Sequence, residues 1–441
     1  MVEGDLFRLK EAFDEGNTIV ARGYHNLKLK SNPFPPDGLA PDDNLLPSSA
    51  ETLEKIGEFV RQFLRTKRYQ GLVVLGTYGM GKTHTLKLIR EQMQRSQLPL
   101  KAVYLLTPGY EPYQMLRGVL RELGQGEVTK WLWNIALKQI IADYRDSPTV
   151  FMNQFVPNVR SGRGRAGAPQ PALFQLKPFG IEALSDYRTF LDAFDAANLS
   201  RDRLRDYIVG VFKEHISEDL GVVGEFTNML IYDQYKSYAS WQNLTVQGAG
   251  NSIFKPEGEA TFLLALLKVL KANGFEYLMI LIDEFEGISL MKRMTRREAI
   301  QYLYALRMLI DRVWHDQPFA FVLASTTQAW QTAKGDLYEA FGDRVPEELT
   351  LPILTEESAR QLMIAYLDTA RNADAEGGSL APFSDDFFSI VGQERRNTPR
   401  QLVRLCYQLV ERAVERGEQQ IDARFIATFL PSITLETAEV G

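Results

Sequence analysis

Several features that mark other classes of protein are scarce in this chain. It has 441 residues but one cysteine, Cys406, so no disulfide can form within it. The setting of that cysteine, LVRLCYQLV, favours a buried helical position over a reactive thiol. No apolar run approaches the roughly 18 residues that a membrane-spanning helix needs, and the N-terminus lacks the basic and apolar regions of a signal peptide. We therefore expect a cytoplasmic protein without a membrane partner.

Positive charge is not in excess either. The chain has 50 Lys and Arg residues against 56 Asp and Glu residues, a net charge of −6. This balance argues against a protein that coats nucleic acid with its whole surface, while a local basic segment stays possible. The 45% of hydrophobic and 24% of charged residues are typical of a globular protein, and the length suggests two or three domains.

Short apolar runs alternate with helical patterns in two parts of the chain. GLVVLG (71–76) and KAVYLL (101–106) are typical of strands that are buried on both faces of a parallel sheet. The pattern resumes later, and its further expected elements are the strand FEYLMILIDEFE (275–286), a helix over 298–314 and the strands FAFVLAST (319–326) and LTLPIL (349–354). A helix over 50–66 precedes the first strand. The alternation predicts an α/β fold with a doubly wound parallel sheet.

The rest of the chain has a different pattern. Residues 1–48 contain Pro and Asp and show little periodicity, so we expect an N-terminal arm there. Helical segments dominate from about 125 to 258, interrupted by the loop RSGRGRAGAPQPA (160–172). We expect a core over 49–355 that contains this helical insertion, followed by an all-helical lid domain over 356–441.

The strongest motif is GTYGMGKT (76–83), which satisfies G-x-x-x-x-G-K-[ST] between an expected strand and an expected helix. Glycines let successive backbone N–H groups surround a phosphate, the helix N-terminus adds partial positive charge, and Lys82 reaches the β and γ phosphates. Thr83 is expected to place its hydroxyl on Mg²⁺. The expected nucleotide-binding residues are Gly76, Thr77, Tyr78, Gly79, Met80, Gly81, Lys82, Thr83 and His84, the last without a catalytic role.

Two carboxylates follow the strand LMILI (278–282). Asp283 and Glu284 lie at its carboxyl end, where open α/β sheets bind their ligands. We expect Asp283 to hold Mg²⁺ through water, and Glu284 to orient and deprotonate the water that attacks the γ-phosphoryl group. Together with the glycine loop, this acid pair predicts a P-loop NTPase that transfers the γ-phosphoryl group of a bound nucleotide to water.

These residues, with ASTTQ (324–328), GDRVPEELTLPILTEESARQL (342–362) and NTPRQLVRL (397–405), resemble the AAA+ ATPases, and within them the origin-recognition and transposition-ATPase branch. The resemblance covers roughly 45–125 and 270–430 and leaves out the insertion. It implies a sensor of the γ-phosphate at Thr326, or at its neighbours Ser325 or Thr327. Further out, the resemblance implies an arginine finger at Arg344; if it acts across a subunit interface, hydrolysis requires assembly. The resemblance also implies a lid arginine at Arg400, with Arg395 and Arg396 as alternatives.

The arm motif NPFPPDGL (32–39) resembles AAA+ relatives in which an N-terminal segment lies over the nucleotide base. Packing of Phe34 on adenine, on the lid or on the core all stay open. About forty residues follow NTPR, and expected lid helices account for them, whereas the origin-recognition branch commonly ends in a winged-helix domain. We therefore do not expect a C-terminal module that reads a specific DNA sequence.

Two basic segments are candidates for contact with DNA. The residues that they offer are Lys292, Arg293, Arg296 and Arg297 after the acid pair, and Arg160, Arg163 and Arg165 in the long loop. Contacts of this kind are independent of DNA sequence and sensitive to salt. LIDEFEGI, the Arg-rich segment and LRMLIDRV also resemble the P-loop proteins of bacterial phage-exclusion systems, over shorter strings.

We therefore expect a Mg²⁺-dependent ATPase that forms a homo-oligomer, as a ring or a filament, and acts on DNA with partner proteins in a mobile-element, defence or DNA-remodelling setting. The alternative is a nucleotide-operated signalling switch of STAND type, which recruits an effector and turns over slowly. Stimulation of hydrolysis by DNA distinguishes the two.

Overall fold

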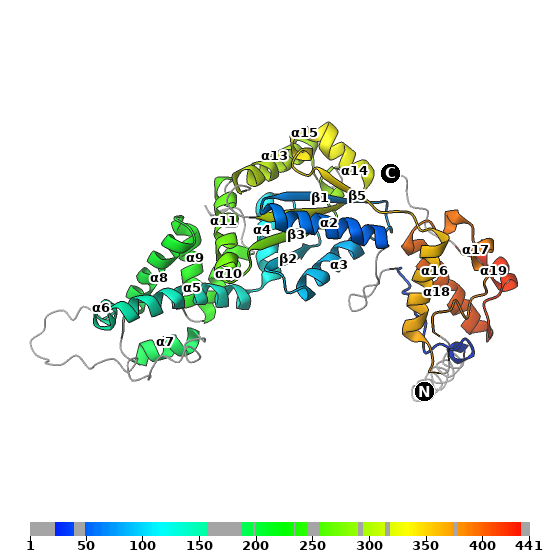
Figure 1. Cartoon of the computed structure of the whole chain (residues 1–441), viewed down its shortest axis with the longest axis horizontal. Helices are drawn as coiled ribbons and strands as arrows, with labels where there is room; N and C mark the ends of the chain where they lie inside the picture. Colours follow the sequence, from blue (N-terminus) through cyan, green and yellow to red (C-terminus); the bar gives the residue numbers. More distant parts are fainter. Residues whose placement is uncertain are drawn as a thin grey trace, which may run out of the picture.

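The computed structural model describes residues 23–38, 49–156, 187–196, 199–232, 234–245, 256–289, 294–313, 318–373, 375 and 377–433. Figure 1 shows three parts in a row: an α/β core in the middle, a helical extension at one end and a helical lid at the other. None of the helices in these described ranges is long and apolar enough to cross a membrane.

The core is built on one parallel sheet. Its strands are β1 (Gln70–Leu75), β2 (Leu100–Leu105), β3 (Tyr277–Ile282), β4 (Phe319–Ser325) and β5 (Glu347–Thr350), in the order β2-β3-β4-β1-β5. Leu75 lies opposite Ser325, and Leu105 lies opposite Ile282, so the carboxyl ends of four strands meet at one edge. The P-loop NTPase fold predicted from the sequence is confirmed. The last strand begins and ends earlier than the predicted 349–354.

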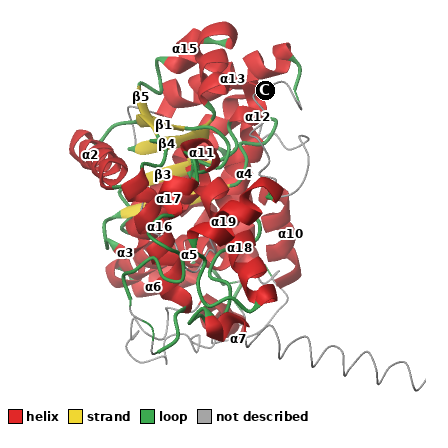
Figure 2. Cartoon of the chain, turned by 90° about the vertical axis from the view of Figure 1, so that its right-hand side faces the viewer, coloured by secondary structure: helices red, strands yellow, loops and turns green. Residues whose placement is uncertain are grey.

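Both faces of the sheet are covered, because successive strand residues point to opposite sides. Leu72, Val74 and Met279 pack in one cluster with the helices α2 (Ala50–Thr66) and α3 (Lys82–Arg95). Val73 and Ile280 pack in a second cluster with α4 (Pro112–Leu123), α11 (Pro256–Ala272) and α13 (Arg296–Val313). Figure 2 shows α2 on one side of the stacked strands and α4, α11 and α13 on the other.

The insertion is helical, as predicted. Its helices are α5 (Gln125–Asp146), α6 (Pro148–Asn153), α7 (Tyr187–Ala196), α8 (Arg201–His215), α9 (Leu220–Ile231) and α10 (Gln234–Thr245), and α11 returns the chain to the sheet. Trp133, Phe155 and Phe226 belong to the same buried cluster as Val73 and Ile280. The insertion therefore extends the hydrophobic core of the α/β part and does not form a separate one.

Four short helices lie between the later strands. They are α12 (Glu286–Ser289), α14 (Thr327–Gln331), the π-helix η4 (Thr332–Leu337) and α15 (Glu339–Gly342). Trp330 and Phe341 from this group pack on Phe285, the residue that follows the acid pair. The turn after β3 is therefore fixed by aromatic packing.

The lid has its own hydrophobic core. Its helices are α16 (Glu356–Ala370), α17 (Phe387–Ile390), α18 (Pro399–Arg416) and α19 (Ala423–Phe429), with the 3-10 turns η5 (Gln393–Arg395) and η6 (Leu430–Ser432). Cys406 is fully buried in this core, as expected, and burial raises the pKa of its thiol.

Part of the expected N-terminal arm belongs to the lid. Leu27, Leu29 and Phe34 are buried in the lid cluster, and the ring of Phe34 lies 5.5 Å from that of Tyr366 and 6.1 Å from that of Phe383, centroid to centroid. Of the three packing partners left open for Phe34, the structure shows the lid. Residues 23–38 therefore belong to the lid core, although they lie far from the lid helices in the sequence.

Candidate nucleotide site

The glycine loop joins β1 to α3 as the motif predicts. Gly79 has φ +80° and Gly81 has φ +91°, a left-handed conformation that glycine adopts readily and other residues rarely do. Gly81 is the N-cap of α3, and no side chain caps this end of the helix. The first turn of α3 therefore offers its backbone N–H groups to an anion, as helix N-termini do in phosphate sites. His84 is half-buried in this turn, and Thr83 is exposed.

Lys82 is the first residue of α3 and is 8% exposed. Its Nζ donates to the carbonyl oxygens of Gly76, at 3.0 Å, and Thr77, at 3.4 Å, and lies 5.3 Å from the centre of the Tyr78 ring. Burial lowers the pKa of the amine, and the carboxylates of Glu286 and Asp283 oppose that effect. A buried cation is thus held inside the glycine loop, where phosphate charge would complement it.

Asp283 lies directly after β3 and is 2% exposed. Its Oδ2 accepts a hydrogen bond of 2.9 Å from the hydroxyl of Tyr104, and its Oδ1 accepts one of 2.9 Å from the backbone N–H of Glu284. A carboxylate has about four lone-pair positions, so both oxygens keep capacity for a further ligand. The expected position of Asp283 beside the glycine loop is what the structure has.

The oxygen atoms of Asp283 and Thr83 fit a magnesium ion. Mg²⁺ prefers hard oxygen ligands and usually takes only one or two from the protein, the others coming from water and phosphate. In the described part of the chain, no group of three or more His, Cys, Asp or Glu residues could hold a metal without other ligands. Two protein oxygens would leave the other ligand positions of such an ion to water and phosphate.

Glu284 has an exposed side chain and φ +48°. A non-glycine residue in this region carries strain of about 1–3 kcal/mol, and such residues cluster at functional sites. The turn around it is fixed by the N–H of Phe285, which donates to the carbonyl of Ala324 at 3.0 Å. Burial and the charges of Glu286 and Glu284 raise the pKa of Tyr78. The acid pair therefore lies at the mouth of the glycine loop, beside Tyr78.

Glu286 is a residue of this site that the sequence did not single out. It begins α12, is 8% exposed, and its Oε1 lies 3.9 Å from Nζ of Lys82. Burial raises the pKa of its carboxyl group, and Lys82 opposes that effect. The only sequence signal was the third acid of Asp-Glu-Phe-Glu, which is a common residue at the start of a helix.

The three sensor candidates have different surroundings. Ser325 is fully buried opposite Leu75, its carbonyl accepts from the N–H of Gly76 at 3.3 Å, and its hydroxyl makes no hydrogen bond to any described residue. Thr326 caps α14, where its Oγ1 accepts from the N–H of Ala329 at 3.2 Å. Thr327 is exposed. The hydroxyl of Thr326 therefore has a structural role, whereas that of Ser325 has none among the described residues.

The lid meets the glycine loop at Arg400. Its N–H donates to the carbonyl of Gly79 at 3.3 Å, and its Nε donates to the carbonyl of Asp37 at 3.1 Å. The two alternatives support the lid instead: Arg395 donates to the carbonyl of Leu430, and Arg396 is buried against the ring of Phe388. Only Arg400 of these three arginines contacts the loop.

Arg344 lies at the amino ends of the strands, opposite the carboxyl ends that hold the glycine loop. Its backbone packs on Gly71, and five residue-to-residue steps, about 17 Å at the usual rise of a strand, separate Gly71 from Gly76. Its Nε lies 2.6 Å from Oδ1 of Asp311, whose other oxygen lies 3.2 Å from Nε of Arg307. Arg344 is therefore not brought to the nucleotide loop of its own chain.

The candidate DNA contacts are described only in part. Arg296 donates through Nη2 to the carbonyl of Asp336 at 3.0 Å, and Arg297 is exposed. The other candidates, Lys292, Arg293, Arg160, Arg163 and Arg165, lie outside the described residues.

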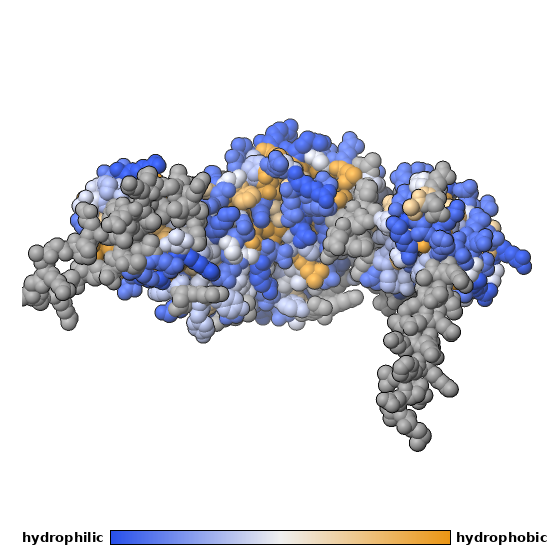
Figure 3. Space-filling view, turned by 90° about the horizontal axis from the view of Figure 1, so that it is seen from below, coloured by the Kyte–Doolittle hydropathy of each residue, from blue (hydrophilic) through white to orange (hydrophobic). Residues whose placement is uncertain are grey.

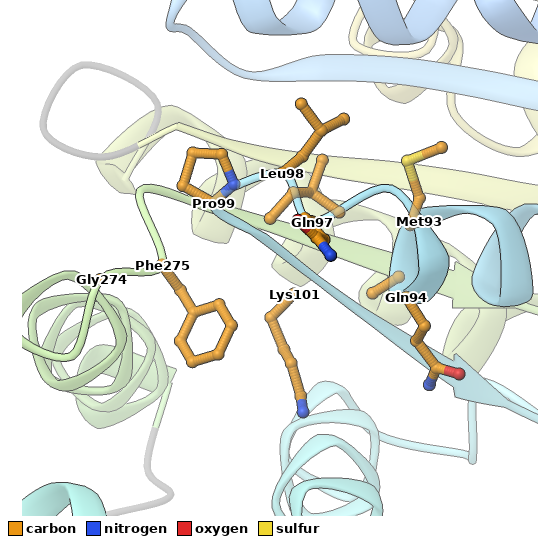
Figure 4. A pocket seen from close by; sticks show the side chains of 10 residues that line it. Met93, Gln94, Gln97, Leu98, Pro99, Lys101, Gly274 and Phe275 are labelled. Atoms are coloured by element: carbon orange, nitrogen blue, oxygen red, sulfur yellow. The ribbon is translucent and has the colours of Figure 1, made fainter.

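A hollow of about 450 Å³ lies at the amino end of β2, away from the glycine loop. Figure 4 shows Phe275 and Lys101 among the side chains that line it. The amine of Lys101 lies 5.7 Å from the centre of the Phe275 ring and 5.6 Å from that of Trp131. This hollow takes no part in the nucleotide site.

Comparison with known proteins gives one family match. The model of the family described as BREX system ATP-binding protein BrxC/D matches residues 251–376, which include β3, β4 and β5. The match confirms, over this segment, the resemblance to P-loop proteins of phage-exclusion systems. No curated protein sequence matches the chain.

Similar solved structures include two origin-recognition proteins of Aeropyrum pernix. The ORC2 protein, in ADPNP–ADP complexes, is 11% identical with a TM-score of 0.43, and the match covers 91% of this chain and 73% of that one. The ORC1 protein, in complex with DNA, is 12% identical with a TM-score of 0.40, and the match covers 89% of this chain and 66% of that one.

Proposed function

We propose that this protein is a Mg²⁺-dependent ATPase of AAA+ type that works as an oligomer on DNA, together with partner proteins, in a defence or DNA-remodelling setting. The observation that supports hydrolysis most directly is the meeting of Lys82, the left-handed glycines and Asp283 at the carboxyl edge of the sheet. A buried lysine and uncapped helix N–H groups bind phosphate, and a nearby buried carboxylate binds the accompanying metal. The cytoplasmic location expected from the sequence stays a prediction.

In this proposal each residue has a separate task. The loop N–H groups and Lys82 bind the β and γ phosphates. Thr83 and Asp283 would hold the magnesium ion, which would supply positive charge next to the phosphoryl oxygens. Glu284 takes a proton from the attacking water molecule. The oxygen of that water bonds to the γ-phosphorus while the bond from the γ-phosphorus to the β–γ bridging oxygen breaks. ADP is the leaving group. Ser325 is the sensor residue that the geometry favours.

The test of hydrolysis compares two neighbouring acids. We expect Glu284→Gln to bind ATP normally and to lower turnover by about 10²-fold or more, since a general base contributes roughly that much. Glu286→Gln is the matched control, because it also removes one carboxylate next to the loop. Phosphate release and ATP binding by calorimetry measure both steps. If Glu284→Gln hydrolyses ATP at the normal rate, Glu284 is not the base, and if the unmodified protein binds no adenine nucleotide, the whole proposal is wrong.

Self-assembly through the nucleotide edge has separate support. Large apolar side chains are exposed on loops that follow three strands at this edge: Tyr78 (47%), Leu106 (62%), Tyr110 (47%) and Ile353 (59%). Figure 3 shows apolar surface gathered mainly over the middle part of the molecule. Exposed apolar groups of this kind often mark protein interfaces. A second copy would cover this edge and bring its Arg344 to the γ-phosphate.

A mixing experiment tests that geometry. Arg344→Ala lacks the finger and Lys82→Ala lacks the nucleotide, so each is expected to be inactive alone. Their mixture should regain part of the activity, because some interfaces combine an intact loop with an intact Arg344. A mixture that stays as inactive as its components would count against a finger that acts across an interface.

The proposed action on DNA is supported by the exposed Arg297, and it is the step that separates this proposal from a signalling switch. We expect duplex DNA to stimulate hydrolysis, with a stimulation that fades as salt rises. Turnover that duplex DNA leaves unchanged at low salt would favour the switch.

A further inference from the structure

Tyr104, near the end of β2, hydrogen-bonds to the proposed magnesium ligand. Its hydroxyl lies 2.9 Å from Oδ2 of Asp283, which is 179 positions later in the chain. The side chain is 9% exposed and packs in the hydrophobic cluster between the sheet and α3. Parallel pairing of β2 with β3 puts Tyr104 opposite Leu281, so the two strands deliver phenol and carboxylate to the same edge.

Two cations from α3 lie over the ring of Tyr104. The guanidinium carbon of Arg90 is 5.6 Å from the ring centre and the amine of Lys87 is 6.0 Å from it. Cations at such distances are attracted to the ring, and they hold it against α3, the helix that begins at Lys82. The phenol hydroxyl is the donor in the bond to Asp283, because a carboxylate can only accept.

We propose that Tyr104 is a positioning residue for Asp283, which it holds in the orientation that binds magnesium. The inference rests on the proposed function, in which Asp283 is a magnesium ligand. The carboxylate accepts one bond on each oxygen, from Tyr104 and from the N–H of Glu284. One such bond leaves the carboxylate plane free to rotate, whereas two bonds on different oxygens fix it. The remaining lone pairs then have a constant direction, which a metal with strict octahedral geometry requires.

The experiment removes one hydroxyl from each end of the core sheet. Tyr104→Phe keeps the ring under the two cations and loses the bond to Asp283. Tyr277→Phe is the matched control: Tyr277 is the first residue of β3, and its hydroxyl donates to the carbonyl of Leu64 at the same distance of 2.9 Å. ATP affinity is measured by calorimetry across a Mg²⁺ titration and again with EDTA, and Mn²⁺ binding to the ATP complex is followed by electron paramagnetic resonance.

We expect Tyr104→Phe to raise the Mg²⁺ and Mn²⁺ concentrations needed for half-maximal binding about 10-fold, the lower end of the range for partners of metal ligands. ATP affinity in EDTA should stay unchanged, because the phenol acts only through Asp283. Tyr277→Phe should match the unmodified protein in both measurements. In an Asp283→Asn background, Tyr104→Phe should have no further effect.

Three results would overturn the inference. In the first, Tyr104→Phe behaves as the unmodified protein although Asp283→Asn abolishes the Mg²⁺ dependence. In the second, both tyrosine variants shift the Mg²⁺ dependence equally, which assigns the shift to a general loss of stability. In the third, Asp283→Asn leaves the Mg²⁺ dependence intact, which refutes the proposed metal ligand itself and is thereby distinguishable from the first two.

Discussion

A methyl group added at Gly79 should separate the lid from the glycine loop. The Cβ of Gly79→Ala would lie 2.8 Å from Cβ of Arg400 and 3.2 Å from Oγ1 of Thr398, both at the start of α18. Gly81 gives a matched control in the same loop. It has the same left-handed sign of φ, +91° against +80°, but a Cβ there would have no heavy atom within 4 Å.

The expected size of the effect follows from these distances. Alanine in the left-handed region costs roughly 1–2 kcal/mol relative to its usual conformations, and both variants carry that strain. Only Gly79→Ala adds a carbon contact well inside the optimum of about 3.5–4.0 Å. The lid has to withdraw by several tenths of an ångström, which lengthens the 3.3 Å bond from the N–H of Arg400 to the carbonyl of Gly79. A hydrogen bond contributes about 1 kcal/mol net, so with lost packing the lid contact weakens by about 2 kcal/mol.

Hydrogen exchange of peptides from the start of α18 measures this loss. A change of about 2 kcal/mol in the opening equilibrium corresponds to roughly 30-fold faster exchange. We expect that acceleration at the amide of Arg400 in Gly79→Ala and unchanged exchange there in Gly81→Ala, with peptides of α16 as the internal reference. Equal exchange at Arg400 in both variants would refute the reasoning, because the left-handed strain would then account for the whole effect.

Three further predictions concern stability and charge. Burial and the nearby Glu111 raise the pKa of Glu259 to about 7 in the folded protein. The protonated carboxyl group therefore stabilises the folded state fully below about pH 4.5, and this contribution is lost as pH rises through 7. Urea unfolding should therefore show a decline of up to about 3 kcal/mol over that interval, and Glu259→Gln should flatten it; an equal decline in the variant would exclude Glu259 as its cause. Glu286→Gln removes a charge that raises the pKa of Lys82, so ATP affinity should fall at a lower alkaline pH than in the unmodified protein, and coincident pH profiles would contradict this. Phe34→Ala should destabilise the lid by about 3–5 kcal/mol in thermal unfolding, since Phe34 is 1% exposed in the lid core, and a loss below 1 kcal/mol would refute that placement.

Local sequence signals predicted the parts of the fold whose causes are local. The helix over 50–66 matches α2, because its apolar residues recur at helical spacing and Ser49 caps it. The strand before the glycine loop was predicted because six consecutive small or apolar residues suit burial on both faces. The last strand was misplaced by two residues at its start, since apolar content favoured LTLPIL. The observed β5 is an edge strand, where Glu348 pairs with Lys334 and Trp330, and charged residues are common on edges.

The contacts that the sequence did not reveal join residues far apart in the chain. Tyr104 and Asp283 are 179 positions apart, and the sequence around either residue gives no sign of its contact with the other. Arg344 pairs with Asp311, which lies 33 positions earlier in the chain, near the end of α13. Side-chain partners depend on how the helices pack on the sheet. The pattern of apolar residues along the sequence predicts which faces are buried, but it does not predict which residues contact one another.

Residues at the start of α18, in the lid, contact both the arm and the glycine loop. Gly79 accepts from the N–H of Arg400, and the carbonyl of Asp37 accepts from its side chain. Gly38 fits against Arg400 and Arg404 so closely that a Cβ there would lie 2.8 Å from Cγ of Arg400. Because Phe34 is also buried in the lid core, the lid cannot leave the loop without carrying residues 23–38 with it. A change in the glycine loop would therefore reach residues 23–38 as well as the lid, through these packed contacts.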